Sequence, residues 1–460
     1  MSQQEQQRPR YRILAIVMNA VGHINACQGL CDKLRDHGHD VVFLIDEEFA
    51  GRLKPFGFEE CHYRMPKPTI ENESGEKIEF WQWFLSHNAK LYSLSPVEQM
   101  EQLNPTVFRT MFDQQRSVED IYRKSIEDIR PDLIISDCYI SCPAIIMSGI
   151  PWIWLFSAAP QAMIMDPRLP PFYSGLPSNG DKKQWQEFQQ RTNKAYESLF
   201  NDINEYSMEK GMQPLNNRLH PLSPYLNIYM WPLEMRYQEM NELPENIFGV
   251  DNLMRKTAQQ QFDIPESIRN KPGKLILFSM GSFGCSNVGL MKRLVGIFSK
   301  SPNRFIVSKG PMEYDLSENM WGDKFLPQKA ILPLVDLVIT HGGNNTVTES
   351  FYFGKKMLIL PTFDDQFDNA QRLVEVGLGA RLNPFESSEK EFLDTIQRLL
   401  DDEQLTERMA KIGERIRGSE NDKEKLTDMI ENRLTQAEVA RYFSVTRAFV
   451  HLIVSELEPN

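Results

Sequence analysis

Short apolar runs of strand length alternate with amphipathic segments in the first half of the chain. The run YRILAIVMN (11–19) precedes an apolar-periodic segment (24–36), and VVFLID (41–46) follows. A buried strand, a helix and a second buried strand in this order predict parallel strands joined by a right-handed crossover. DLIISD (132–137) and PWIWLFS (151–157) are expected to extend the same sheet.

A second alternating set begins at residue 275. Its apolar runs are LILFSMGS (275–282), RFIVSKG (304–310), VDLVITHGG (335–343) and KMLILPTF (356–363). The segment 242–274 has three prolines and no clean hydrophobic period, which predicts a linker. The pattern therefore predicts two α/β domains of the Rossmann-like kind, 1–241 and 275–430. A charged helical segment, 431–460, follows, and packing back on the first domain is one arrangement for it.

Composition narrows the class of protein. The 460 residues carry a net charge of −12, and no run is rich in Lys and Arg, so neither nucleic acid nor an anionic membrane surface is the expected partner. The amino-terminal MSQQEQQRPR lacks the apolar core of a signal peptide, and no run reaches the ~20 apolar residues of a membrane span. The six cysteines lack zinc-site spacing and are expected to be reduced. A monomeric cytoplasmic protein is the expectation.

The stretch DLVITHGGNNTVTES (336–350) ends an apolar run at a polar, glycine-opened corner. The first-turn N–H groups of a helix are unpaired and bind anions. Asn345 and Thr346 are capping residue types that also donate to phosphate oxygens, and Glu349, one turn later, suits the hydroxyls of a ribose. The alternative is an ordinary capped helix behind a glycine turn.

Two other corners are expected at the same sheet edge, where ligands of parallel sheets bind. In SMGSFG (279–284), Ser282 and small glycines let the backbone approach a phosphate. In LPTFDDQFDNAQ (360–371), Asp365 and Gln366 together accept and donate hydrogen bonds, as sugar hydroxyls require. The alternative for the second corner is a solvated helix start.

A candidate general base lies in the first domain. His23 follows the first strand, where a helix N-terminus favours the neutral imidazole. Asp137 ends a neighbouring predicted strand and is placed to orient that imidazole and stabilise its cation. The alternative role of His23 is capping or packing.

Missing motifs exclude several classes. The chain has no G-x-x-x-x-G-K-[ST] of a P-loop NTPase, and no G-x-G-x-x-G follows the first strand. It also lacks the Asp-x-Asp metal clamp of many nucleotide-sugar enzymes, so no metal is expected. Phosphate charge would then be neutralised by helix ends, His341 and hydroxyl groups.

The segment from Leu326 to Leu382 closely resembles the signature of the UDP-glycosyltransferases, glycosyltransferase family 1. Its order of Pro-Gln, His-x-Gly-x-Asn-Thr, Glu, Gly, Pro, Asp-Gln and Asn-Ala is specific. GHINA (22–26) resembles the family's Gly-His-x-x-Pro corner, with Ala26 where proline is common. The resemblance implies the GT-B fold, in which two Rossmann-like domains face each other across a cleft. It also implies inverting transfer of a sugar from a UDP-sugar, in a soluble member without signal peptide or membrane helix.

The resemblance also implies roles for individual residues. His23 matches the catalytic base and Asp137 its partner. Phe325 takes the place of a uracil-stacking tryptophan. The full set implied for UDP-sugar binding is Gly22, Ser282, Phe325, Gln328, His341, Gly343, Asn345, Thr346, Glu349, Asp365 and Gln366. Within it, Ser282, His341, Asn345 and Thr346 match diphosphate contacts, Gln328 a residue beside the uracil, Glu349 the ribose contact, and Asp365 and Gln366 the sugar contacts.

The acceptor is expected to be a small lipophilic molecule, such as a phenol, flavonoid, macrolide or xenobiotic. Aromatic and Met-rich runs supply the candidate contacts Trp81, Phe84, Trp154 and Met163, for which core packing is the alternative. Gln366 is compatible with glucose as the donor sugar. A UDP-sugar epimerase of similar fold and a non-catalytic UDP-sugar-binding protein are the alternative functions, and no cofactor besides the co-substrate is expected.

Overall fold

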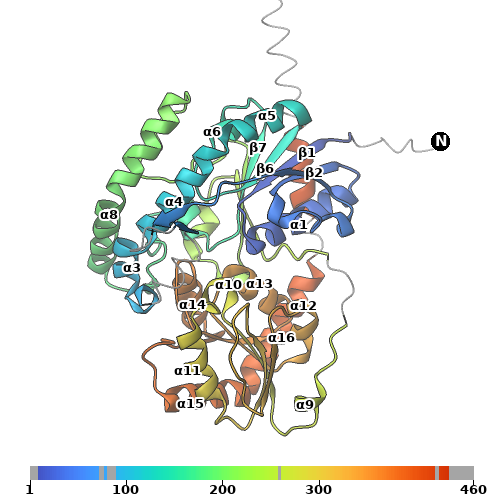
Figure 1. The fold of residues 1–460 in the computed structure, drawn as a ribbon, viewed down its shortest axis with the longest axis vertical. Helices are drawn as coiled ribbons and strands as arrows, with labels where there is room; N and C mark the ends of the chain where they lie inside the picture. The colour runs from blue at the N-terminus through green and yellow to red at the C-terminus, as the bar shows by residue number, and fades with distance from the viewer. Residues whose placement is uncertain (1–8, 72–76, 80–89, 257–260, 420–423, 435–460) are drawn as a thin grey trace, which may run out of the picture.

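A computed structural model describes residues 9–71, 77–79, 90–256, 261–419 and 424–434. Two sheets form the centres of two α/β domains, one above the other in Figure 1. Every strand pair within these two sheets is parallel. The prediction of two Rossmann-like α/β domains is therefore confirmed.

The first sheet has seven strands in the order β3-β2-β1-β6-β7-β8-β9. Its strands are β1 (Arg12–Val17), β2 (Asp40–Asp46), β3 (Glu59–Tyr63), β6 (Leu133–Asp137), β7 (Trp152–Phe156), β8 (Leu226–Met230) and β9 (Ile247–Val250). The helices of this domain are α1 (Val21–Asp36), α3 (Pro96–Gln102), α4 (Asn104–Ser117), α5 (Glu119–Ile129), α6 (Pro143–Ile146), α7 (Gln161–Ile164) and α8 (Lys182–Glu209), and a hairpin joins β4 (Thr69–Glu71) to β5 (Lys77–Glu79).

The second sheet has six strands in the order β12-β11-β10-β13-β14-β15. Its strands are β10 (Leu275–Ser279), β11 (Arg304–Ser308), β12 (Met320–Asp323), β13 (Leu337–Thr340), β14 (Lys356–Ile359) and β15 (Gly379–Arg381). Its helices are α9 (Glu266–Arg269), α10 (Gly281–Gly284), α11 (Val288–Phe298), α12 (Gln328–Ile331), α13 (Asn344–Tyr352), α14 (Gln366–Glu375), α15 (Glu389–Asp401) and α16 (Glu403–Gly418).

Strand order places the chemistry-bearing corners side by side. Strand β1 lies between β2 and β6, and Val17 pairs with Asp137, so the turn after β1 lies beside the end of β6. Strand β13 lies between β10 and β14, and Thr340 pairs with both Ser279 and Ile359. The carboxyl ends of the second sheet, with α10, α13 and α14, face the first domain (Figure 1).

Two segments belong to the first domain although they lie outside the residue range predicted for it. Strand β9 forms the edge of the first sheet although it lies inside the segment predicted as a linker, because its four residues are too short to stand out among the flanking prolines. The helical residues 424–434 come after α16 of the second domain, but Leu426, Ile430 and Leu434 are buried in the core of the first.

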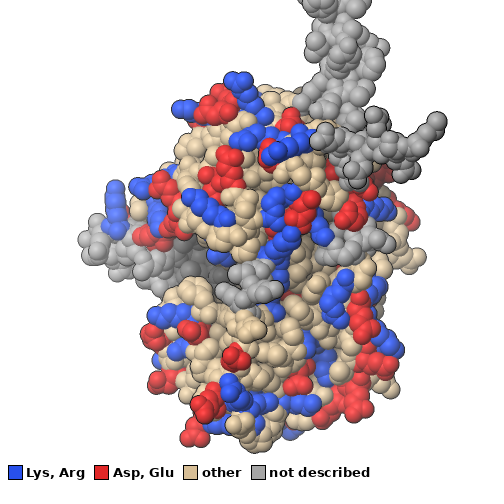
Figure 2. All heavy atoms as spheres, turned by 90° about the vertical axis from the view of Figure 1, so that its right-hand side faces the viewer, with Lys and Arg blue, Asp and Glu red and all other residues tan. Residues whose placement is uncertain are grey.

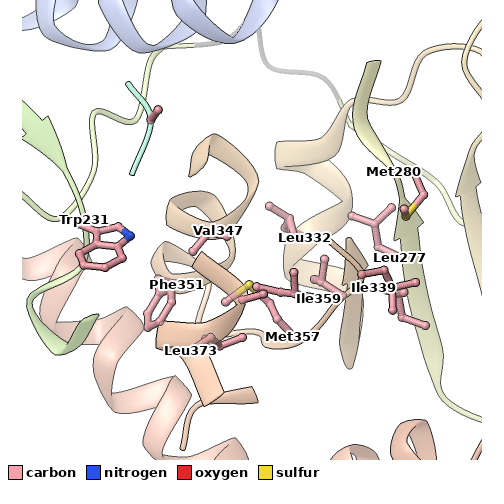
Figure 3. Packing of buried hydrophobic residues seen from close by; sticks show 14 of the residues in the cluster. Trp231, Leu277, Met280, Leu332, Ile339, Val347, Phe351, Met357, Ile359 and Leu373 are labelled. Atoms are coloured by element: carbon pink, nitrogen blue, oxygen red, sulfur yellow. The ribbon is translucent and has the colours of Figure 1, made fainter. Parts of the chain in front are cut away.

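Apolar packing is continuous between the domains. One cluster of buried side chains contains Leu14 and Trp154 of the first domain together with Phe351 and Leu358 of the second. Figure 3 shows Trp231, from the segment after β8, beside the core residues around α13. The Trp231 indole donates to Asn369 Oδ1 over 2.8 Å, so a buried polar contact fixes this apolar junction.

The face of the molecule drawn in Figure 2 carries no large basic area. Figure 2 shows acidic and basic side chains interspersed over one face of the molecule. Within the described ranges, no helix combines the length and apolar character that crossing a bilayer requires.

Candidate functional site

A histidine and an aspartate meet at the carboxyl edge of the first sheet. His23 lies in the first turn of α1, and its Nδ1 is 2.9 Å from Oδ2 of the fully buried Asp137. Ser157 Oγ is 3.0 Å from the same nitrogen, and the Ser157 N–H donates to Asp137 Oδ1 over 3.4 Å. Because Nδ1 is engaged, Nε2 is the nitrogen left to take a proton.

A cavity of about 370 Å³ lies next to this pair: neither His23 nor Asp137 lines it, but residues 18–20 and 138–140, close to them in the chain, do. Tyr139 lines it and packs edge-on against the His23 ring, with 5.0 Å between the ring centroids. Its wall combines three methionines and two tyrosines, which suit the apolar part of a ligand, with four charged and three amide side chains. The lining residues are Met18, Asn19, Ala20, Asp46, Glu48, Met65, Lys67, Pro68, Glu79, Met111, Gln114, Gln115, Tyr122, Cys138, Tyr139 and Ile140.

Two of the predicted acceptor contacts, Trp154 and Met163, do not line this cavity. Trp154 is buried, stacks on His220 and donates from its indole to the Cys138 carbonyl. Met163 is fully buried in the core, so packing explains both side chains. Trp81 and Phe84 lie outside the described residues. The aromatic residues of β7 cluster in the sequence because they belong to the core. The cavity is lined by single residues from many segments, so no cluster in the sequence marks it.

In the second domain, His341 sits in a tight glycine corner after β13. A Cβ atom on either Gly281 or Gly343 would come within 2.5 Å of the His341 ring, so both positions need glycine for this arrangement. Burial lowers the pKa of His341 to about 4, and the ring is therefore neutral near pH 7. His341 can serve an anion there as a hydrogen-bond donor.

The start of α13 holds the first domain as well as facing the expected diphosphate. Asn345 Nδ2 donates to the carbonyl of Gly22 over 3.0 Å, so the predicted phosphate contact here joins the domains. Asn344, the preceding residue, donates to carbonyls of the first domain too. The Ser282 backbone lies in α10 at the neighbouring corner, and its side chain is outside the described part of the chain.

The predicted ribose contact belongs to a hydrogen-bonded cluster. Gln328 Nε2 donates to Glu349 Oε2 over 2.7 Å and lies 3.3 Å from Thr346 Oγ1. Arg255 Nη1 donates to Glu349 Oε1 over 2.9 Å. Sequence reasoning missed Arg255, because it belongs to the predicted linker and only the fold brings it here. Phe325 is 85% exposed, which leaves its ring open to a stacking partner.

The third corner carries three buried or partly buried carboxyl groups. Asp365 Oδ2 accepts from the Ala159 N–H over 3.0 Å, and burial raises the pKa of Asp365 to about 7. Burial also raises the pKa of Asp368 to about 7, although its carboxylate accepts from the N–H groups of Tyr173 and Gly175. Burial and the neighbouring Asp365 raise the pKa of Asp364 well above its usual range.

Gln366 is oriented by the loop before it. Its Oε1 accepts from the Thr362 N–H (2.9 Å), the Thr362 hydroxyl (3.0 Å) and the Phe363 N–H (3.1 Å). The amide Nε2 is therefore the atom left to donate to a ligand. Fixing one end of an amide in this way sets the direction of its other end.

Comparisons with known proteins agree with this architecture. The family model described as "UDP-glucoronosyl and UDP-glucosyl transferase" matches residues 229–415. Human UDP-glucuronosyltransferase 1A6 is 23% identical over 427 residues, covering 87% of this chain and 78% of that protein. NDP-glycosyltransferase YjiC of Bacillus subtilis (strain 168) is 21% identical over 406 residues, covering 87% and 92%.

Solved structures share the fold along nearly the whole chain. The glycotransferase of kitacinnamycin superposes with a TM-score of 0.66 at 17% identity, covering 93% of this chain and 99% of that one. The calicheamicin glycosyltransferase CalG4 gives a TM-score of 0.65 at 18% identity, covering 93% and 98%. The chain thus has the GT-B fold, and its residues 229–415 match the family model of the UDP-glucuronosyl and UDP-glucosyl transferases.

Proposed function

We propose that this enzyme transfers glucose, with inversion, from UDP-glucose to a hydroxyl group of a small lipophilic acceptor. The observation that carries the proposal is the His23–Asp137 contact of 2.9 Å beside a cavity of about 370 Å³. An imidazole whose Nδ1 is held by a buried carboxylate is suited to general-base catalysis through Nε2.

Transfer then proceeds in one displacement. The acceptor oxygen attacks the anomeric carbon while His23 Nε2 takes its proton, and the bond from that carbon to the UDP oxygen breaks. Asp137 stabilises the imidazolium that forms. General-base catalysis of this kind contributes ~10²–10⁴-fold to the rate.

The second domain is proposed to hold the leaving UDP. The N–H groups at the start of α13 and the corner at α10 face the diphosphate, with His341 as a neutral donor. Glu349 accepts the ribose hydroxyls, and Gln328 and the exposed Phe325 ring lie on the uracil side. Gly22 and Gly343 keep the backbone corners open, and Asn345 and Thr346 complete the helix start.

The acidic corner supports glucose over glucuronate as the donor sugar. Asp365 and the Gln366 Nε2 are proposed to bind the sugar hydroxyls, and Asp364 and Asp368 lie within three residues of Asp365. The raised pKa values of all three carboxyl groups show that negative charge is already unfavourable here. A uronate would add a further carboxylate, whereas a neutral hexose adds none.

The wall of the cavity supports an apolar acceptor of adaptable shape. Met18, Met65 and Met111 line it, and methionine side chains reshape at low cost around different ligands. Tyr139 places one side of the cavity next to His23. A phenol, flavonoid, macrolide or xenobiotic with one hydroxyl directed at His23 Nε2 fits this description.

The test is an acceptor panel assayed with UDP-glucose, UDP-galactose, UDP-glucuronate and UDP-N-acetylglucosamine. Glucosides should form fastest, and His23→Gln should lower turnover at least about 100-fold with UDP affinity within about threefold of the wild type. Faster transfer of glucuronate would contradict the sugar assignment, and full activity of His23→Gln would contradict the base. Conversion of a UDP-sugar to its isomer without acceptor would favour an epimerase instead.

A further inference from the structure

A three-residue segment after β7 connects the proposed base to the second domain. Ser157 contacts His23 through its hydroxyl and Asp137 through its N–H. Two residues later, the Ala159 N–H donates to Asp365 at the start of α14. Residues 157–159, called here the bridge segment, therefore contact both proposed halves of the reaction.

Asn344 holds this segment from the opposite side. Its Nδ2 lies 3.1 Å from the Ser157 carbonyl, 3.4 Å from the Ala158 carbonyl and 2.8 Å from the Met230 carbonyl. The residue is only 4% exposed and begins α13, the helix whose start faces the expected diphosphate. One buried amide group thus ties the donor helix to the backbone of the residue that contacts the base.

The position of the Ser157 peptide sets the geometry of the His23–Asp137 pair. Without the Asn344 donor on its carbonyl, residue 157 loses a contact that fixes its backbone. Its hydroxyl beside His23 Nδ1 and its N–H, which belongs to the preceding peptide unit and points at Asp137, are then free to shift. A base displaced from its productive geometry loses much of its catalytic effect, because proton transfer needs close hydrogen-bond distances.

We propose that Asn344 is a positioning residue, which holds the bridge segment and so couples the start of the donor helix to the orientation of His23. This inference rests on the proposed role of His23 as the base. Asn344 itself is not expected to touch the acceptor or the transferred sugar, so its effect should follow how much each acceptor depends on the base.

Acceptors of different acidity distinguish a positioning role of Asn344 from a general loss of structure in its variants. An aliphatic alcohol needs its proton removed during attack, whereas an acidic nitrophenol is largely ionised before it attacks. We expect Asn344→Ala and the nearly isosteric Asn344→Asp to lower kcat for the alcohol roughly 10- to 100-fold. For the nitrophenol the loss should stay below about threefold, with KM for UDP-glucose changed by no more than that factor.

Arg372→Ala is the matched control. Arg372 also reaches from the second domain to backbone carbonyls of the first, those of Met235 and Arg236, but it does not contact the bridge segment. If domain contact alone mattered, this variant would show the same preference for the nitrophenol. Asn344→Ser keeps a short polar side chain and serves as the second variant if the alanine protein does not fold.

The outcomes distinguish this inference from the proposed function. Equal losses on both acceptors, or the same pattern in Arg372→Ala, would overturn the role of Asn344. If His23→Gln shows the acceptor-dependent loss and the Asn344 variants do not, only this inference fails. If His23→Gln glycosylates the alcohol normally, the base itself is wrong.

Discussion

The two sheet edges that face each other differ in the groups they present: side chains at the first edge, and mainly glycines and backbone N–H groups at the second. At the first edge, the His23 ring contacts the side chains of Asp137 and Ser157, and the Ser157 N–H donates to Asp137, so the three residues form a compact buried polar group. At the second edge, glycines leave room for the His341 ring and for backbone N–H groups. Several of its polar side chains, Asn345 among them, are engaged with the first domain.

This difference matches the two tasks. A proton acceptor must have one orientation, so its partners are side chains fixed within a single domain. A diphosphate is larger and carries its charge over many oxygens, so backbone donors and space suit it better. The base should therefore be sensitive to the loss of one partner, and the donor site to the loss of space.

The largest effect is expected from Asp137→Ala. Without the carboxylate, the imidazolium loses its stabilising partner and the ring its orientation, so kcat should fall roughly 10²–10³-fold. Steady-state kinetics would show this, with UDP affinity unchanged by calorimetry. Asp132→Asn, at the opposite end of β6, removes a carboxylate that accepts from the Arg12 N–H and should leave turnover unchanged. A similar loss in both variants would contradict the assignment.

Glu349→Gln tests the ribose contact. The variant keeps the shape of the side chain but loses the charge that strengthens its hydrogen bonds, so UDP should bind roughly 10- to 100-fold more weakly. Binding of 2′-deoxy-UDP should weaken less, because one of the hydroxyl groups is already absent. Equal losses for the two nucleotides, measured by calorimetry, would show that Glu349 does not read the ribose.

Gly281→Ala tests the need for space. Gly281 has φ +65°, and its new Cβ would lie 2.5 Å from the His341 ring, so the ring must move. We expect UDP to bind about tenfold more weakly, because a displaced His341 ring no longer donates to the diphosphate and a lost hydrogen bond is worth about 1 kcal/mol or more. Gly296→Ala is the control, because nothing lies within 4 Å of its Cβ position in α11. Unchanged affinity in Gly281→Ala would remove this corner from the donor site.

The remaining prediction concerns the pH dependence of stability rather than activity. The pKa of Asp368 is about 7 in the folded protein, and an unfolded aspartate titrates near ~3.9. Between these values the folded state keeps a proton that the unfolded state releases, so the free energy of unfolding falls as pH rises, by up to ~1.4 kcal/mol per pH unit. Above pH 7 the difference is constant.

Asp368→Asn should remove this contribution. Denaturant unfolding between pH 4.5 and 7 would show the wild type losing stability relative to the variant as pH rises. Asp394→Asn, at an exposed position of α15, is the control and should follow the wild type. Parallel curves for the wild type and Asp368→Asn would show that this carboxyl group titrates normally.

Much of the fold was predictable because central strands of a parallel sheet are continuous apolar runs. The runs around Leu14, Ile135 and Val338 are of this kind, and each forms a strand. Edge strands such as β3, with the sequence EECHY, and β12, with MWGD, carry polar residues or glycine and gave no comparable pattern. Apolar runs in the sequence therefore predict these central strands, whereas the edge strands β3 and β12 leave no such run.

The candidate site was predictable where it lies on one strand end and not where it depends on the facing domain. His341 and Glu349 follow one apolar run, so their proximity is local. The contacts of Asn344 with Ser157 and of Arg255 with Glu349 join residues 187 and 94 positions apart. Such pairs depend on how two separately folded units meet, which hydrophobic periodicity does not encode.

The helical residues 424–434 give the molecule a second covalent connection between its domains. The chain crosses once between β9 and β10, and returns after α16 to bury Leu426, Ile430 and Leu434 in the first core. Two bodies joined at one point can turn in any direction, whereas two bodies joined at two points turn mainly about the line through both. The two connections, together with the buried packing between the domains, therefore restrict their relative motion more than a single linker would.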